Sequence, residues 1–158
     1  MIVQHKKAFS MVTAIFVIVI MASVGMLVMS VSSKTIKVTT QQYRKEQAIL
    51  LAKSYTEFAV MAVTANDRNQ QCAEIIIGDD ILGDTASGQG YQAEVFILYI
   101  GNNAEVANCN NVLDNNVQRQ SSELQIIIDV YIRYHDIDRV DGGQNDWITY
   151  HKRTLQKI

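Results

Sequence analysis

The densest group of potential metal ligands in the sequence is a run of four aspartates in residues 136–146. These are Asp136, Asp138, Asp141 and Asp146. Carboxylate oxygens are the ligands that calcium prefers, and the spacing is close to that of Asp-x-Asp-x-Asp-Gly calcium loops. The run has one extra residue before the third aspartate and lacks the downstream bidentate glutamate. The sequence favours a solvated hairpin turn here, in which Asp, Asn and Gly are the usual residues. A calcium site is the alternative, and calcium is the one cofactor that these residues could hold.

The only two cysteines, Cys72 and Cys109, are too few for a four-cysteine metal site. They lack the Cys-x-x-Cys spacing of redox motifs, which argues against thiol chemistry. A bridge between them would close a loop of about 38 residues and, on the chain-entropy model, stabilise the fold by about 4 kcal/mol. We expect a structural disulfide if this part of the chain lies in an oxidising compartment.

Motifs typical of enzymes are missing. No Gly-x-Ser-x-Gly or Walker A sequence occurs, and Gly83, Gly88 and Gly90 have the spacing of a flexible loop rather than of a phosphate cradle. His135 and His151 could face each other on adjacent strands, but they have no third ligand. The sequence therefore predicts a protein that is not an enzyme.

The charge distribution argues against direct contact with DNA. The whole chain has a net charge of −2, whereas residues 66–158 hold 7 Lys and Arg against 14 Asp and Glu, a net charge of −7. Such a surface repels phosphate over most of its area. Only a local patch at residues 151–153 could contact DNA.

An apolar segment precedes all of these residues. From Ala8 to Ser33, 26 consecutive residues carry no charge. A helix of that length reaches roughly 39 Å and can cross a hydrocarbon core of about 30 Å. The run is too long for the apolar region of a secretory signal peptide. We therefore expect a single membrane-spanning helix, and Lys6 and Lys7 ahead of it favour a cytoplasmic N-terminus, although Lys34 and Lys37 flank its far side.

The junction at residues 6–14 resembles the processing site of type IV prepilins and pseudopilins. In that family a short basic leader is removed after a small residue and the new N-terminal residue, usually phenylalanine, is methylated. The matching positions are Ala8 and Phe9. The resemblance implies a leader at residues 1–8, cleavage by a prepilin peptidase, and assembly into a filament through the apolar helix at residues 9–33.

Two departures from the family pattern affect the expected role. Ala8 replaces the usual glycine, and Thr13 stands at the fifth mature position, where most members carry a glutamate. That glutamate is thought to neutralise the N-terminal amine of a neighbouring subunit, and a threonine cannot supply the charge. The resemblance therefore implies a minor or tip-type subunit. The chain also has no proline, and Gly25 is the only flexible point between Phe9 and Ala65, where it could locate a bend or simply allow close helix contact.

The helix is expected to continue to about Ala65 as an amphipathic segment, residues 34–65. An apolar stripe with one polar member recurs there at steps of three and four, as in a helix that packs one face on another element. The stripe consists of Tyr43, Gln47, Leu51, Tyr55, Phe58 and Ala62. A parallel coiled coil is the alternative, but the segment spans only about four heptads.

Residues 66–158 have the pattern of an antiparallel β head. Strands are expected at 91–100, at 125–134, where one face is fully apolar and would lie across the helix, and from 147 to about 155. Residues 74–77 and 81–82 fit either a strand or a turn of helix.

Together these features predict an α+β fold of the pilin type, with a long N-terminal helix packed on a small antiparallel sheet. The expected function is a minor pilin or pseudopilin of a type IV pilus, type II secretion or DNA-uptake filament. Its expected partners are other pilin subunits, the prepilin peptidase, the inner-membrane assembly platform and, before assembly, membrane lipid. It would be a single-pass bacterial inner-membrane protein with a periplasmic head. The alternative is an unprocessed single-span membrane protein whose periplasmic head binds a ligand or partner.

Overall fold

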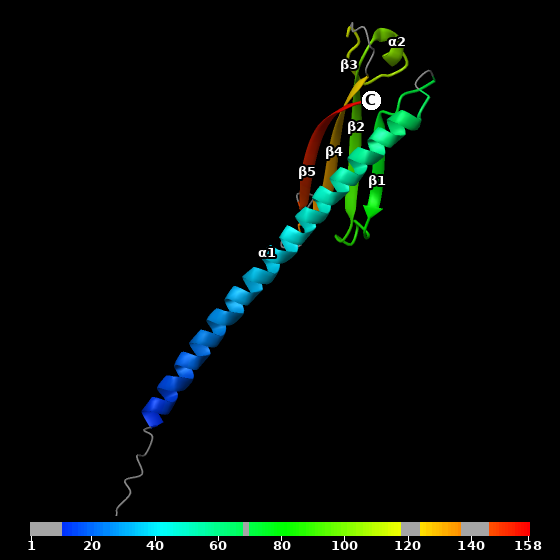
Figure 1. The fold of residues 1–158 in the computed structure, drawn as a ribbon. Coiled ribbons are helices and arrows are strands. Elements are labelled where there is room, and N and C mark those ends of the chain that lie inside the picture. The colour runs from blue at the N-terminus through cyan, green and yellow to red at the C-terminus, as the bar shows by residue number, and fades with distance from the viewer. Residues whose placement is uncertain (1–10, 68–69, 118–123, 137–145) are drawn as a thin grey trace, which may run out of the picture. The chain divides into compact units, whose positions relative to one another are not determined.

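The computed structural model describes residues 11–67, 70–117, 124–136 and 146–158, which form a long helix, a short helix and a five-stranded sheet (Figure 1). The elements in chain order are α1 (Met11–Ala65), β1 (Ile75–Ile81), β2 (Tyr91–Ile100), α2 (Asn103–Val106), β3 (Val112–Asp114), β4 (Gln125–His135) and β5 (Trp147–Lys157). The chain divides into two compact units, Met1–Thr40 and Gln41–Ile158. Each unit is described by itself.

In the first unit, the described residues form the N-terminal part of α1. The sequence contains no proline, so no residue there lacks a helical N–H donor. Hydroxyl side chains bond back to carbonyl oxygens of the preceding turn, as Ser23 Oγ does to Ile20 (2.8 Å) and Thr35 Oγ1 to Val31 (3.0 Å). These bonds satisfy polar groups within the helix itself, which is what a helix surrounded by hydrocarbon requires.

The second unit is an α+β arrangement in which the C-terminal part of α1 packs on a mainly antiparallel sheet. The strand order is β1-β2-β4-β5, with β3 beside β2. Neighbouring strands on the main path are antiparallel, and β3 pairs with β2 in parallel. β2 and β4 are paired over their whole length, from Tyr91↔Tyr134 to Ile100↔Gln125. The predicted fold class, a long helix on a small antiparallel sheet, is confirmed.

The expected strands are present, and the ambiguous segment is resolved. β2 has the predicted bounds, whereas β4 ends one residue later than expected and β5 extends to Lys157. Residues 75–81 form a strand rather than a turn of helix, and pair with β2. The predicted apolar face of β4 is buried, from Ile126 at one end to Tyr134 at the other. The helix ends at Ala65, as expected.

The predicted contact face of the helix is wrong. Tyr43 and Phe58 are 63% and 48% exposed, and Leu51 and Tyr55 are only partly buried. The buried stripe lies one position away and consists of Ala48, Ala52, Thr56, Ala59 and Val63. The volume of the side chains on the two surfaces explains this shift of the contact face. The facing side of the sheet is filled with large side chains, so the helix approaches it through small ones, and the larger residues lie at the margins of the contact.

The side of the sheet that faces the helix is almost entirely large and apolar. Its buried members are Tyr91, Ala93, Val95, Ile97 and Tyr99 of β2 and Ile126, Ile128, Val130, Ile132 and Tyr134 of β4. One glycine is needed for close approach at the β1 side of the contact. A Cβ added at Gly78 would lie 2.2 Å from the hydroxyl oxygen of Tyr55, so even alanine does not fit there without a shift of the tyrosine.

Candidate functional site

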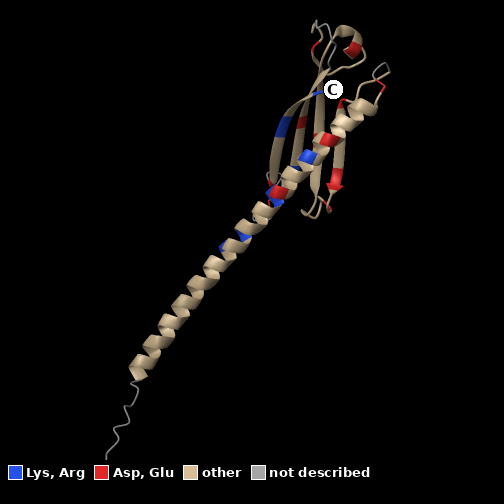
Figure 2. Ribbon diagram, in the orientation of Figure 1, with Lys and Arg blue, Asp and Glu red and all other residues tan. Residues whose placement is uncertain are grey.

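The candidate functional element of the first unit is the apolar segment of α1. Among the residues that the structure describes, α1 is the one helix long and apolar enough to cross a membrane, and none of its apolar window is buried. The ribbon of Figure 2 has no blue or red over the N-terminal part of α1, and in the sequence the first charged residues after Lys7 are Lys34 and Lys37. The segment is therefore compatible with a single-pass membrane protein.

The large apolar side chains of this segment are exposed around the whole helix. They include Phe16, Ile18, Met21, Leu27 and Met29, each more than 60% exposed. A helix that is apolar on every side is stable only where its surroundings are also apolar, in lipid or among other helices. The segment therefore requires apolar surroundings, which lipid or other apolar helices would supply.

The sequence-predicted processing and assembly residues fall partly within the described chain. Ala8 and Phe9 lie outside the described residues. Thr13 is exposed on α1. At Gly25 an added Cβ would meet nothing within 4 Å, so among the described residues this glycine makes no close contact with another element.

In the second unit, Arg44 attaches α1 to the end of β4 and to the loop that precedes β2. Its guanidinium donates from Nη1 to the carbonyl oxygen of His135 (2.8 Å) and from Nη2 to that of Gly88 (3.1 Å). One turn further on, the Tyr91 hydroxyl donates to Gln47 Oε1 (2.7 Å). Sequence reasoning did not single out Arg44, because its two acceptors are backbone carbonyls, which leave no sequence signal.

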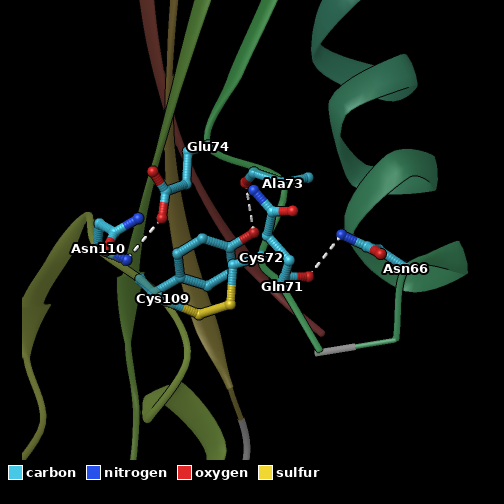
Figure 3. The surroundings of a disulfide bond; sticks show 8 residues. Asn66, Gln71, Cys72, Ala73, Glu74, Cys109 and Asn110 are labelled. Carbon is cyan, nitrogen blue, oxygen red and sulfur yellow. Dashed lines mark hydrogen bonds between the residues drawn. A yellow bond between two sulfur atoms is a disulfide. The ribbon is translucent and has the colours of Figure 1, made fainter. Parts of the chain in front are cut away.

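A disulfide joins Cys72, which follows α1, to Cys109, which follows α2 (Figure 3). Their Cα atoms are 5.0 Å apart. Hydrogen bonds secure the same corner, since the Tyr99 hydroxyl donates to the carbonyl oxygen of Ala73 (2.5 Å). In addition, the backbone N–H of Asn110 donates to the Glu74 carboxylate. The bridge thus ties the segment leaving the helix to the loop after β2, which gives it a structural role.

The aspartate run is described only at its two ends. The backbone N–H of Asp136 donates to the carbonyl oxygen of Asp146 (2.8 Å), which continues the β4–β5 pairing by one step. Asp138 and Asp141 lie outside the described residues. Within the described part of the chain, no three His, Cys, Asp or Glu side chains are placed to hold a metal ion. The calcium site stays a prediction.

The structure does not bring His135 and His151 together. His135 packs against Trp147, with ring centroids 3.8 Å apart. His151 lies four residues after Trp147 on β5, and its ring stacks on that of Tyr131 with a centroid distance of 4.4 Å. The two histidines lie on the same face of the sheet but in different rows.

A charged cluster on the sheet face away from α1 was not predicted from the sequence. Asp129 is only 4% exposed. Its carboxylate accepts two hydrogen bonds from the Arg153 guanidinium, both 2.7 Å, and lies 2.9 Å from His151 Nε2. The Arg153 hydrogen bonds hold the pKa of Asp129 below its ordinary value, with His151 acting in the same direction and burial opposing them. The alternating sequence pattern of β4 places Asp129 on the face that carries both polar and apolar residues. Its partners, Arg153 and His151, follow only from the pairing of β4 with β5.

The sequence matches no protein-family model, no curated protein and no solved structure.

Proposed function

We propose that the chain is a minor pilin or pseudopilin, a subunit that joins a type IV pilus, type II secretion or DNA-uptake filament through its apolar N-terminal helix. The observation that carries the proposal is α1. It is one continuous helix whose N-terminal part is apolar and exposed on every side, and its C-terminal part packs on the sheet through small residues.

The sequence at the start of this helix supports the same proposal. A short leader with Lys6 and Lys7 ends at Ala8, directly before Phe9 and the apolar run. Cleavage at that point leaves the whole apolar segment in the mature chain, whereas a secretory signal peptide is removed with its apolar region. Thr13, an uncharged residue at the fifth mature position, favours a minor subunit.

The head fits a role in binding other proteins rather than in catalysis. Its charged cluster at Asp129 is satisfied internally by Arg153 and His151. Its disulfide closes the corner between α1 and β2, as expected for a head exposed to an oxidising compartment. We place this head in the periplasm, with the N-terminus in the cytoplasm.

Mass spectrometry of the mature N-terminus tests the proposal. The full chain is expressed with a C-terminal tag in a bacterium that has a prepilin peptidase, and in a matched strain that lacks it. We expect a chain that begins with methylated Phe9 in the first strain and an intact leader in the second. An intact leader in both strains would instead identify an unprocessed single-span membrane protein whose head binds a ligand or partner.

A further inference from the structure

The two edges of the head sheet differ in regularity. β5 pairs with β4 over eleven consecutive residue pairs, from Gln125↔Lys157 to His135↔Trp147, and no register shift interrupts them. β1, at the opposite edge, has a shift between Gly78 and Ile81, and Asp80 there has φ of 53°. Irregularities of this kind protect sheet edges from pairing with other chains. The backbone of β1 therefore protects that edge, whereas β5 has no register shift that would do so.

The register also shows which backbone groups of β5 point outward. Ile158 donates its backbone N–H to the carbonyl oxygen of Leu124 (2.9 Å). In an antiparallel pair, residues that exchange hydrogen bonds alternate with residues that do not. Even-numbered β5 residues therefore bond to β4. The odd-numbered residues direct their N–H and C=O groups away from it, from Thr149 through His151 and Arg153 to Leu155. In the described part of the chain no strand pairs with this edge.

The strands at the two sides of the sheet differ in the sign of their net charge. β4 and β5 together hold four basic residues and one acidic residue, whereas β1 and β2 hold three acidic residues and no basic one. β5 itself carries Lys152, Arg153 and Lys157 with no Asp or Glu. This basic edge belongs to a head whose net charge is −7. An acidic strand beside β5 would therefore meet opposite charge, which an acidic strand beside β1 would not.

The basic side chains of β5 do not prevent another strand from pairing with its edge. Lysine is often placed on edge strands to prevent pairing. Here Arg153 is bonded to Asp129 on one face of the sheet, and Lys152 Nζ lies 3.5 Å from Thr56 Oγ1 on the other. The two charges are thus held on opposite faces of the sheet rather than along its edge.

We propose that the free edge of β5 binds an extended acidic segment of a partner protein as an additional strand. Main-chain hydrogen bonds to the odd-numbered residues would supply affinity, and alternate side chains would supply specificity. Acidic side chains on the face that carries Lys152, alternating with apolar side chains on the face that carries Leu155, which is 61% exposed, would complement the edge.

A second copy of the chain fits this edge less well. An antiparallel pair of two β5 strands would bring Lys152 and Arg153 of one copy beside the same residues of the other, and like charges across a strand pair are destabilising. The β1 edge of a second copy is acidic, but it offers only the four residues before its register shift, Ile75 to Gly78, as regular strand. The acidic partner segment is therefore the occupant that we assign.

Fluorescence anisotropy with the full-length chain in dodecyl maltoside micelles tests the proposal. The probe is a labelled eight-residue peptide of alternating Glu and Val. Its controls are the same peptide with N-methylated backbone amides, and a peptide of alternating Lys and Val. We expect the Glu-Val peptide to bind at least tenfold more tightly than either control.

Variants of the chain locate the binding. Thr149→Pro removes an outward N–H and leaves the β4 ladder intact, so it should weaken binding at least tenfold, whereas its matched control Thr149→Val should not. Lys152→Glu should reverse the preference toward the Lys-Val peptide. Circular dichroism of each variant verifies that the head is folded.

Three results would overturn the proposal. Equal binding of the N-methylated peptide would exclude strand addition, and equal binding of the Lys-Val peptide would exclude selection for acidic segments. Self-association of the chain that Thr149→Pro abolishes would assign the edge to a second copy. None of these results depends on whether the chain is processed at Phe9, so the test is independent of the proposed function.

Discussion

The small-residue stripe of α1 predicts that enlarging one buried alanine destabilises the head much more than enlarging an exposed one. Ala52 is fully buried against the sheet, whereas Ala65, at the end of the same helix, is exposed. Ala52→Leu adds three carbon atoms where no space exists, and overpacking of this kind costs about 1–3 kcal/mol. Ala65→Leu places the same atoms in solvent, where surface substitutions change stability by about 0.5 kcal/mol or less.

The cost converts into a measurable shift of the melting temperature. For a unit of this size, 1 kcal/mol corresponds to roughly 4 °C. We therefore expect Ala52→Leu to lower the melting temperature by about 4–12 °C and Ala65→Leu to change it by about 2 °C or less. The assay is thermal unfolding of the full-length chain in detergent micelles, followed by the near-ultraviolet circular dichroism of the aromatic residues in the head.

A third variant separates the observed contact face from the one that the sequence pattern favours. Phe58 is 48% exposed, and its ring contacts Tyr55 edge-on at 6.4 Å. Phe58→Ala should therefore cost about 1–2 kcal/mol, well below the 3–5 kcal/mol typical of a fully buried phenylalanine. If Phe58→Ala costs 3 kcal/mol or more while Ala52→Leu behaves like Ala65→Leu, the assigned packing of the helix is wrong.

Two further predictions concern the disulfide and the charged cluster. Replacing both Cys72 and Cys109 by serine should lower the free energy of unfolding by about 4 kcal/mol, measured by urea denaturation, and dithiothreitol should have the same effect on the wild type but none on the variant. The depressed pKa of Asp129 stabilises the fold above the unfolded-state pKa of about 3.9. This contribution should be lost as the pH falls below that value, and an Asp129→Asn variant, whose side chain does not titrate, should show a shallower loss of melting temperature between about pH 5 and pH 2. A wild-type profile that matches the variant's would contradict the assigned role of Arg153.

The parts of the fold that could be predicted are those encoded by local pattern. β2 ends at a Gly-Asn-Asn turn signal and starts at Tyr91, and both boundaries follow from strand formers and loop residues that are neighbours in sequence. The length of α1 follows from the absence of any helix breaker as far as Ala65. β1 was ambiguous because its first three isoleucines are followed by Gly78 and two aspartates, and only the register with β2 distinguishes a strand interrupted by a bulge from a helical turn.

The parts that could not be predicted depend on what lies opposite in space. Two stripes one position apart on α1 could face the sheet, one with large side chains and one with small side chains. The large one is the usual choice for a contact face, but the β2 and β4 side chains opposite it already fill the interface, so the stripe through Ala52 is buried instead. Asp129 illustrates the same limit, because its burial is tolerated only by a guanidinium that the strand register brings alongside it.

The apolar side chains in the two halves of α1 are removed from water in different ways, and this difference bears on function. In the C-terminal half the helix buries small residues against its own chain, so that contact is complete without a partner. In the N-terminal half the apolar side chains have no cover within the described chain, and roughly 25 cal/mol per Å² of exposed apolar surface favours any environment that removes water. Lipid and a bundle of similar helices both do so, and the free energy difference between them is small because both are apolar. For the proposed filament subunit, transfer of this helix from lipid to a bundle of similar helices would therefore carry no large penalty, provided that every charge is paired. Thr13 adds no charge of its own, but it also supplies none to the N-terminal amine of a neighbouring subunit, so that amine would need another partner.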